Sequence, residues 1–174
     1  MNVDLLEVIK NRRSIRKFKS KPVEKEKLDK LLEAAEWAPS AGNLQARDVI
    51  LVTEQKTKEE LVKAKYGRGV QHFILDAPVV IVVCVNQQKA LPHGQRGTSL
   101  YCIQDATASI QNILLMAYAL GLGSCWIGAF DEDSVREVLG IPKHARPIAI
   151  IPLGYPDESP RPTPRKIDLH KEHW

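Results

Sequence analysis

The sequence lacks any apolar stretch long enough to cross a membrane. The longest, residues 113–122, is only about half of the ~20 residues that a spanning helix needs. The N-terminus also lacks a basic stretch followed by an apolar one, so no secretory signal is visible. We therefore expect a cytoplasmic protein that does not bind a membrane.

Cysteine is scarce, and its spacing shows no metal or disulfide pattern. The chain has 3 cysteines, Cys84, Cys102 and Cys125, which lie far apart among apolar neighbours. Metal sites and disulfide frameworks need clustered or evenly paired cysteines. We therefore expect reduced thiols in the core and no metal site.

The signatures of common catalytic machinery are absent as well. There is no Gly-x-Ser-x-Gly, no His-Glu-x-x-His and no Walker motif, and the 5 histidines are scattered without ligand spacing. Residues 121–126 resemble part of a dinucleotide fingerprint, but they follow a helix and precede a strand, which is the reverse of a Rossmann turn. These absences argue against a metal hydrolase and favour a bound cofactor that performs the electron chemistry itself.

What the chain does have is an alternation of helical and strand patterns within one domain. With 174 residues, of which 44% are hydrophobic, it can bury roughly two thirds of its unfolded surface around one core. Asp131 and Gly140 are typical caps of a helix, and Gly121 and Pro39 are typical helix ends. Periodicity predicts helices around residues 5–9 and over 24–38, 58–65, 104–120 and 131–139, and strands over 49–53, 78–85, 125–130 and 147–154.

Two features concern the assembly of the domain. The helix over 104–120 is apolar almost all round from Ile113 onward, so we expect it in the centre of a larger structure. Residues from about 157 to 174 carry Pro160, Pro162 and Pro164 and little apolar periodicity, so they form no packed element. They are either an extended arm across a partner subunit or a disordered tail.

Basic residues gather in two places, although the net charge is only +4. The segment Arg12-Arg13-Ser14-Ile15-Arg16 brings guanidinium groups and a hydroxyl together, and guanidinium forks match phosphate oxygens. A second group, around Arg165, lies near the C-terminus. A solvated basic face is the alternative. Nucleic acid is disfavoured, because no aromatic residues are interleaved with these charges as a stacking surface requires.

Two neutral segments carry groups suited to a planar ring. In residues 39–45, Gly42 permits a close backbone approach, and Ser40, Asn43 and Gln45 offer neutral donors and acceptors. Residues 126–128, Trp-Ile-Gly, can form a wall with an open backbone beside a planar ligand. An ordinary turn and plain core packing are the respective alternatives.

Taken in order, these segments resemble the nitroreductase family of FMN enzymes. The match runs through nearly the whole chain. It rests on Arg12–Arg16, Pro39-Ser40-x-x-Asn43-x-Gln45, Asp76-Ala77-Pro78, Gly121–Gly128, Ile141-Pro142, Leu153–Pro156 and Pro164-Arg165-Lys166.

The resemblance implies an α+β fold in which helices flank a mixed, mainly antiparallel sheet, as one domain over residues 1–174. It also implies a homodimer, intertwined through the long helix and through the C-terminal arms, about residues 157–174. Two FMN sites per dimer would each be lined by both subunits.

The resemblance further implies roles for particular residues. The FMN phosphate and ribityl chain would be held by Arg12, Arg13, Ser14 and Arg16, with Arg165 from the arm. From the other subunit, the flavin ring would be bordered by Pro39, Ser40, Ala41 and Asn43, with Gln45 close by. Near the reactive edge would lie Trp126, Ile127 and Gly128, where a backbone N–H can stabilise reduced flavin.

The activity implied is NAD(P)H-dependent reduction of nitroaromatic, quinone or similar acceptors by ping-pong hydride transfer. No side chain need act covalently, so we assign no catalytic residue. One rival is a family branch with other flavin chemistry, such as flavin reduction, enone reduction or reductive dehalogenation. The other rivals are an FMN-binding storage or sensor protein and a basic module for anions or nucleic acid.

The chain departs from the family pattern in two places. Ala46-Arg47 follow Gln45 where many relatives have Pro-Trp, and the stretch between Lys65 and Phe73, where relatives vary the substrate cap, is short. The sequence therefore does not identify the physiological acceptor, the preferred nicotinamide or the residues in 65–73 and 86–100 that would bind them.

Overall fold

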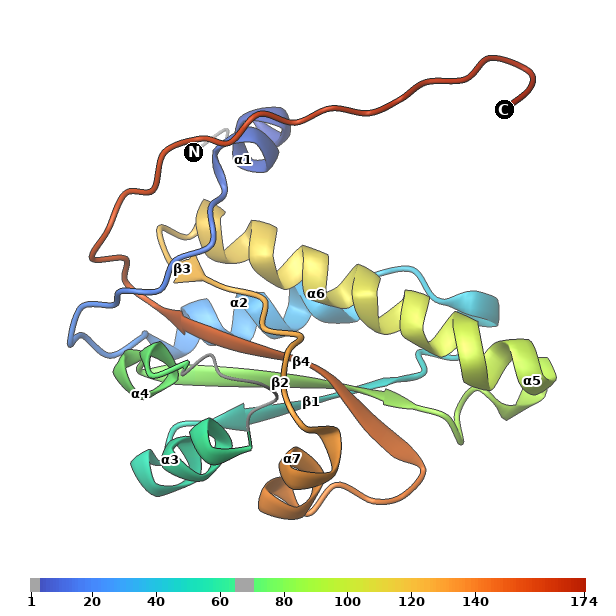
Figure 1. Ribbon diagram of the computed structural model, residues 1–174, viewed down its shortest axis with the longest axis horizontal. Coiled ribbons are helices and arrows are strands. Elements are labelled where there is room, and N and C mark those ends of the chain that lie inside the picture. The colour runs from blue at the N-terminus through green and yellow to red at the C-terminus, as the bar shows by residue number, and fades with distance from the viewer. Residues whose placement is uncertain (1–3, 65–70) are drawn as a thin grey trace.

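The computed structural model describes residues 4–64 and 71–174, and its elements form three layers (Figure 1). The helices are α1 (Leu5–Asn11), α2 (Lys25–Glu36), α3 (Gln55–Lys63), α4 (Phe73–Asp76), α5 (Gly94–Arg96), α6 (Cys102–Ala119) and α7 (Glu132–Leu139). The strands are β1 (Arg47–Val52), β2 (Val79–Asn86), β3 (Gly123–Ser124) and β4 (Ala145–Gly154). Helices α2 and α6 cover one face of the sheet, and α3, α4 and α7 cover the other.

The sheet has the strand order β1-β2-β4-β3, and its strands pair antiparallel throughout. Every residue of β2 is buried, because Ile81 and Val83 enter the core under α6 while Val80 and Val82 enter the core on the opposite face. The strand predicted over residues 78–85 and the predicted α+β fold are thereby confirmed. A parallel contact occurs at the isolated bridge between Ser14 and Ser124.

The cap signals in the sequence were reliable. The side chain of Asp131 accepts a hydrogen bond from Ser134 N at 2.8 Å, and α7 ends at Gly140 with a left-handed φ of 61°. Gly121, with φ 74°, follows α6, and α2 ends just before Pro39. Helix α3 begins at Gln55, earlier than predicted, and its predicted last residue lies outside the described residues.

The predicted strand over residues 125–130 is wrong. Strand β3 covers only Gly123 and Ser124, and beyond it the ladder continues as one isolated bridge between Ile127 and Ile150. Cys125 N donates to Pro152 O at 3.3 Å, but the opposing residue is a proline. Because proline has no N–H to return a second bond, the ladder is interrupted there.

Helices α1 and α6 leave apolar surface uncovered. Of the predicted face of α1, Val8 is buried, whereas Leu5 is 65% exposed. Together with α2 and α6, this helix borders an apolar groove of about 310 Å³ into which Trp37, 81% exposed, also projects. Within one chain α6 is therefore a face helix rather than a central one, since Leu115 and Met116 remain partly exposed at this groove.

The residues after β4 form an extended arm. Asp157 N donates to Lys17 O at 2.9 Å, and Phe18 bridges to Pro156, so the first part of the arm runs beside the segment that precedes α2. Farther on, the arm passes α1 and leaves the body of the domain (Figure 1). Ile167 and Leu169 are almost fully exposed there.

The three cysteines are free and buried, as predicted. None of the helices among the described residues combines the length and the apolar character that a membrane span requires.

Candidate functional site

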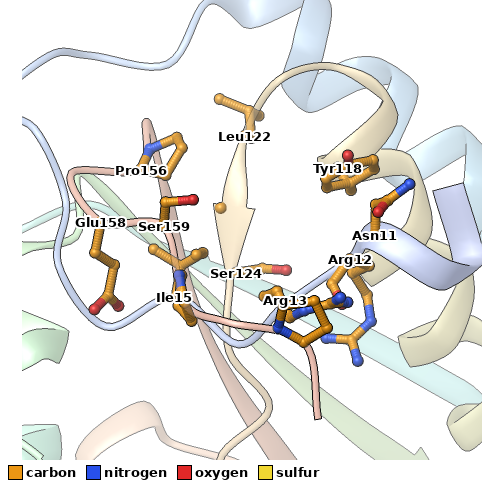
Figure 2. Close-up of a pocket in the computed structure, with 13 residues that line it drawn as sticks. Asn11, Arg12, Arg13, Ile15, Tyr118, Leu122, Ser124, Pro156, Glu158 and Ser159 are labelled. Atoms are coloured by element: carbon orange, nitrogen blue, oxygen red, sulfur yellow. The ribbon is translucent and has the colours of Figure 1, made fainter. Parts of the chain in front are cut away.

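A hollow of about 370 Å³ lies beside the C-terminal end of α6. We call it the basic hollow: Arg12, Arg13 and Ile15 line it from one side, Tyr118 and Ser124 from α6 and β3, and Glu158 and Ser159 from the arm. Figure 2 shows Arg12 and Arg13 next to each other, with Glu158 across the hollow from them. Three segments far apart in the sequence thus meet around one space.

The basic segment is fastened to β3 by its backbone. Ile15 N donates to Ser124 O at 3.0 Å, and the Ile15 side chain is buried against Gly123. A Cβ at Gly123 would lie 2.8 Å from three carbon atoms of Ile15, so only glycine permits this approach. The close contact holds Arg12 and Arg13 at the rim of the hollow.

Arg12 and Arg13 line the hollow together with Glu158, whose carboxylate is bound by backbone N–H groups rather than by these two guanidinium groups. The pKa of Arg12 is lowered from its usual value, first by burial and then by repulsion from Arg165 and Arg13. Within residues 4–64 and 71–174, no ion pair includes any of these three arginines. Because like charges repel and burial disfavours an unpaired charge, the arrangement is suited to an anion.

The other two predicted phosphate ligands point elsewhere in this chain. The guanidinium carbon of Arg16 lies 6.0 Å from the centre of the Phe73 ring, and Arg16 does not line the hollow. Ser14 does not line the hollow either, and it lies near the thiol of Cys125, whose pKa is raised, chiefly by burial. Of the predicted set, Arg12 and Arg13 line the hollow, Arg165 lies near Arg12, and Ser14 and Arg16 lie outside the lining.

Glu158 is a site residue that the sequence did not reveal. Its carboxylate accepts hydrogen bonds from the backbone N–H groups of Arg16 and Lys17, and so ties the arm to the basic segment. These partners are 142 and 141 positions apart in the chain. No local pattern encodes such a contact.

The predicted wall over residues 126–128 is only partly available to a ligand. Trp126 and Gly128 are exposed, but Ile127 is buried and its N–H donates to Ile150 O at 2.9 Å. Sheet pairing therefore uses the N–H of Ile127, which leaves Trp126 and Gly128 as the exposed part of the segment. The N–H of Gly128 takes part in no hydrogen bond within the described chain.

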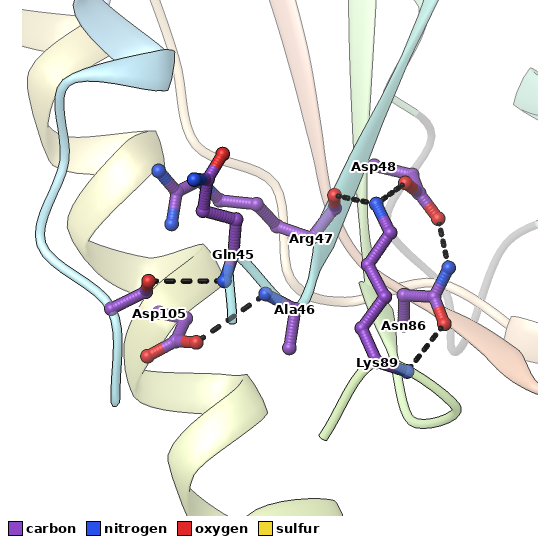
Figure 3. Close-up of polar contacts among 8 residues, drawn as sticks. Gln45, Ala46, Arg47, Asp48, Asn86, Lys89 and Asp105 are labelled. Atoms are coloured by element: carbon purple, nitrogen blue, oxygen red, sulfur yellow. Dashed lines mark hydrogen bonds and ion pairs between the residues drawn. The ribbon is translucent and has the colours of Figure 1, made fainter. Parts of the chain in front are cut away.

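The neutral loop, residues 39–45, lies at the opposite end of α6. Asp105, buried near the start of α6, accepts from Ala41 N at 2.9 Å. It also accepts from Ala46 N at 3.4 Å (Figure 3). Gly42, Asn43 and Gln45 all have φ values between 50° and 57°. Such backbone conformations cost free energy in residues other than glycine and persist chiefly where a site requires them.

The side chains of the loop are accessible. Ser40 accepts from Gln45 N through its hydroxyl at 3.0 Å, while Pro39, Asn43 and Gln45 are exposed and Ala41 is half-buried. The loop thus presents neutral groups on a backbone held from beneath by Asp105.

The two halves of the predicted site are far apart in one chain. Asp105 contacts the neutral loop and Tyr118 lines the basic hollow. Both belong to α6, and at 1.5 Å per residue they lie about 20 Å apart. Figure 1 shows β3 and α5 at the two ends of this helix.

Comparison with known proteins places this architecture. A family model described as the nitroreductase family matches residues 9–70 and 62–155. The chain belongs to the nitroreductase family. A family relative from Methanothermobacter thermautotrophicus, provisionally named NADH dehydrogenase/NAD(P)H nitroreductase, is 39% identical over 99% of this chain and 88% of its own length.

Solved structures of family members agree. An FMN-dependent nitroreductase from Clostridium difficile R20291 superposes with a TM-score of 0.83 at 32% identity, covering 97% of this chain and 99% of that one. The NADPH:FMN oxidoreductase from Vibrio harveyi, complexed with NAD+, superposes with a TM-score of 0.88 at 28% identity, covering 98% of this chain and 77% of that one.

Within this nitroreductase-family fold, the departure at Arg47 has a structural role. Its Nη2 donates to Glu36 O at 2.8 Å and to Ala38 O at 2.9 Å. Arg47, just after the neutral loop, is thus hydrogen-bonded to the residues just before it. Burial lowers the pKa of Arg47, and nearby Asp105 and Glu36 partly offset this. Its buried Nη1 has no hydrogen-bond partner in the described chain. The only sequence signal for this role of Arg47 was the departure of Ala46-Arg47 from the Pro-Trp of many relatives.

Proposed function

We propose that this chain is an FMN-dependent NAD(P)H oxidoreductase that reduces nitroaromatic, quinone or similar acceptors. The observation that carries the proposal is the basic hollow, which Arg12 and Arg13 line without carboxylate partners in ion pairs and near which Arg165 lies. Guanidinium groups in this arrangement fit a phosphate monoester, the anionic end of FMN. Bound FMN supplies hydride transfer between a nicotinamide and an acceptor.

Each residue of the proposed site has a defined task. Arg12, Arg13 and Arg165 would bind the phosphate, with Ser14 and Arg16 beside them. The exposed Trp126 and the unused N–H of Gly128 would face the reactive edge of the ring. A fixed backbone donor at that edge stabilises negative charge as it develops on reduction.

We propose further that each site is completed by a second copy of the chain. The neutral loop lies about 20 Å from the basic hollow of its own chain, as judged from the rise of α6. An antiparallel pairing of two α6 helices would bring the loop of one subunit to the hollow of the other. The apolar groove with Trp37 and Leu5 supports this pairing, because a stable protein rarely leaves such a surface in water. The arm, residues 157–174, would then lie across the partner.

The loop residues would border the ring from the second subunit. Pro39, Ser40, Ala41, Asn43 and Gln45 supply neutral contacts, and Asp105 and Arg47 keep their backbone in place. No acid, base or nucleophile of this chain is assigned to the reaction.

Several relatives support the nicotinamide donor and the cofactor by their names. One is named for NAD(P)H, one is described as FMN-dependent, and one is an NADPH:FMN oxidoreductase solved with NAD+. The acceptor class, the ping-pong order and the cytoplasmic location are predictions that remain to be measured.

The test is the visible absorption spectrum of the purified protein before and after anaerobic addition of NADH or NADPH. We expect flavin bands that bleach with a nicotinamide and return when a nitroarene or quinone is added. Parallel lines in double-reciprocal plots of initial rates would establish the ping-pong order. Stoichiometric FMN without reduction by either nicotinamide would instead identify a storage or sensor protein. A colourless protein that FMN does not reconstitute would overturn the proposal.

A further inference from the structure

Residues 91–101, between β2 and α6, form a tightly built turn of the chain that none of the roles above uses. Gln87 Nε2 donates to Thr98 O at 3.2 Å, and Ser99 Oγ donates to Gln95 O at 2.7 Å. Gly97 lies so close to the carbonyl of Ala90 that a Cβ there would overlap it. We call these residues the 91–101 segment. Its last part, Gly97–Tyr101, is a π-helical turn, a rare conformation that is frequent at functional sites.

The 91–101 segment is seated on the neutral loop. A Cβ at Gly42 would lie 2.6 Å from His93 Nε2, so the imidazole ring is packed directly against this glycine. On its other side His93 meets the ring of Tyr101, with 5.7 Å between the ring centres and an angle of 80°. Any ligand bordered by the loop is therefore also close to this segment.

The segment presents a cation that has no carboxylate partner. Arg96 is exposed, and its Nε donates to the hydroxyl of Tyr101 at 3.1 Å. Its guanidinium carbon lies 5.3 Å from the centre of the Tyr101 ring. In the part of the chain that the structure describes, no ion pair includes Arg96. Tyr101 thus orients a guanidinium group whose remaining N–H donors have no hydrogen-bond partner among the described residues.

We propose that Arg96, oriented by Tyr101 and held beside the neutral loop by His93, makes the enzyme prefer acceptors that carry a carboxylate next to their aromatic ring. A guanidinium group binds a carboxylate through two parallel hydrogen bonds, and a neutral amide of the same shape cannot form this charged pair. The inference rests on the proposed function, because it takes the loop to border the flavin ring. It adds the charge of the acceptor, which the family resemblance does not define.

The first test measures binding without turnover. Oxidised, FMN-loaded protein is titrated calorimetrically with benzoate and with benzamide, which have nearly the same shape and differ in charge. We expect wild type to bind benzoate more tightly by about three- to tenfold, since the site is partly exposed to water. Arg96→Ala abolishes the preference, Arg96→Lys retains most of it, and Arg96→Glu reverses it.

The second test measures the acceptor half-reaction alone. Protein photoreduced under anaerobic conditions with a sacrificial electron donor is mixed with 4-nitrobenzoate or 4-nitrobenzamide, and the ratio of the two reoxidation rate constants is compared among the variants. The nicotinamide is omitted because its phosphate groups could themselves bind Arg96 and compete with the acceptor. We expect Arg96→Ala to lower the ratio by about three- to tenfold.

The matched control is Lys56→Glu, which changes the net charge equally at an exposed position on α3, on the opposite face of the sheet. If Lys56→Glu lowers the ratio as much as Arg96→Glu does, long-range charge explains the preference and the inference is overturned. It is also overturned if wild type shows no preference, or if Arg96→Ala slows both acceptors equally. Loss of FMN binding in wild type would overturn the proposed function instead, so the two failures are distinguishable.

Discussion

The two ends of α6 are built on opposite principles. At the C-terminal end, Arg12 and its cationic neighbours are held together with their charges unpaired, and the polypeptide there is anchored by the packing of Ile15 on Gly123. At the N-terminal end, the neutral loop carries strained backbone at Asn43 and Gln45, held by a buried carboxylate. One end offers charge for affinity, and the other offers a fixed shape.

In the proposed enzyme, neither end is a complete site by itself. A basic hollow alone binds any small anion, and a strained loop alone has nothing to border. We expect the largest effect on FMN binding from a variant that prevents the two ends from meeting in the proposed dimer. Variants that change only one end should have smaller effects.

The largest effect is expected from Trp37→Glu. A carboxylate placed in the apolar groove would be buried without a partner on association, so the dimer dissociation constant should rise roughly a hundredfold or more. FMN should be lost in parallel, because each site would need both chains. Analytical ultracentrifugation with absorbance detection of flavin follows both quantities. Leu51→Glu, at an exposed apolar residue of β1, is the control. A monomeric Trp37→Glu protein that keeps its FMN would contradict the dimer model.

Asp105→Ala should damage the loop end. The change leaves Ala41 N and Ala46 N without their acceptor and removes the negative charge beside buried Arg47, at a cost of about 2–4 kcal/mol in the free energy of unfolding. Urea unfolding of the apoprotein measures it. Asp105→Asn keeps an acceptor oxygen and should lose less. Equal stability of wild type and Asp105→Ala would show that the carboxylate does not hold the loop.

Arg12→Ala and Arg165→Ala should weaken FMN binding at the basic hollow, whereas Asp105→Ala should lower the stability of the protein. Loss of one charge-assisted contact weakens FMN binding by about 1.5–3 kcal/mol, or roughly ten- to a hundredfold. The apoprotein with Arg12→Ala should unfold no more easily than wild type, since the lowered pKa of Arg12 shows that its charge is disfavoured there. Flavin fluorescence titration and urea unfolding give the two values, with exposed Lys143→Ala as control. Unchanged FMN affinity in both variants would refute the phosphate assignment.

The smallest effect is expected on the pH dependence of stability, through Cys84 in strand β2. Burial raises the pKa of the Cys84 thiol from 9.0 to about 12. Above about pH 9 the unfolded thiol ionises while the folded one does not, so stability present below this pH is lost as the pH rises toward 12. The loss is at most roughly 1.4 kcal/mol per pH unit. Cys84→Ala should reduce the dependence of the free energy of unfolding on pH, measured by urea unfolding at several pH values between about 8 and 10. An unaltered slope would show that Cys84 is not the source.

Much of the fold followed from local patterns. The continuous apolar run over residues 78–85 predicted the buried strand β2, and Asp131 with Gly140 predicted both ends of α7, because each signal depends on neighbours within a few residues. The family resemblance pointed to residues 12–14, to the neutral loop and to Arg165. The structure holds the first of these segments and Arg165 together.

Other features had no local signal. The strand expected over residues 125–130 ends early because its neighbour across the sheet is Pro152, and the N–H of Ile127 is taken by Ile150. The 91–101 segment matched neither a helical nor a strand period, since its turns are short and of mixed type. Periodicity detects long regular elements, so irregular ones escape it.

The sequence by itself determined the helices and strands with clear periods, their caps and the presence of a basic segment, since these depend on residues close together in the chain. Only the tertiary structure decided that Glu158 ties the arm to Arg16 and that Arg47 closes the neutral loop. It also decided that the two halves of the site lie at opposite ends of α6. Sheet register and helix length set those distances, and both arise from packing between distant parts of the chain.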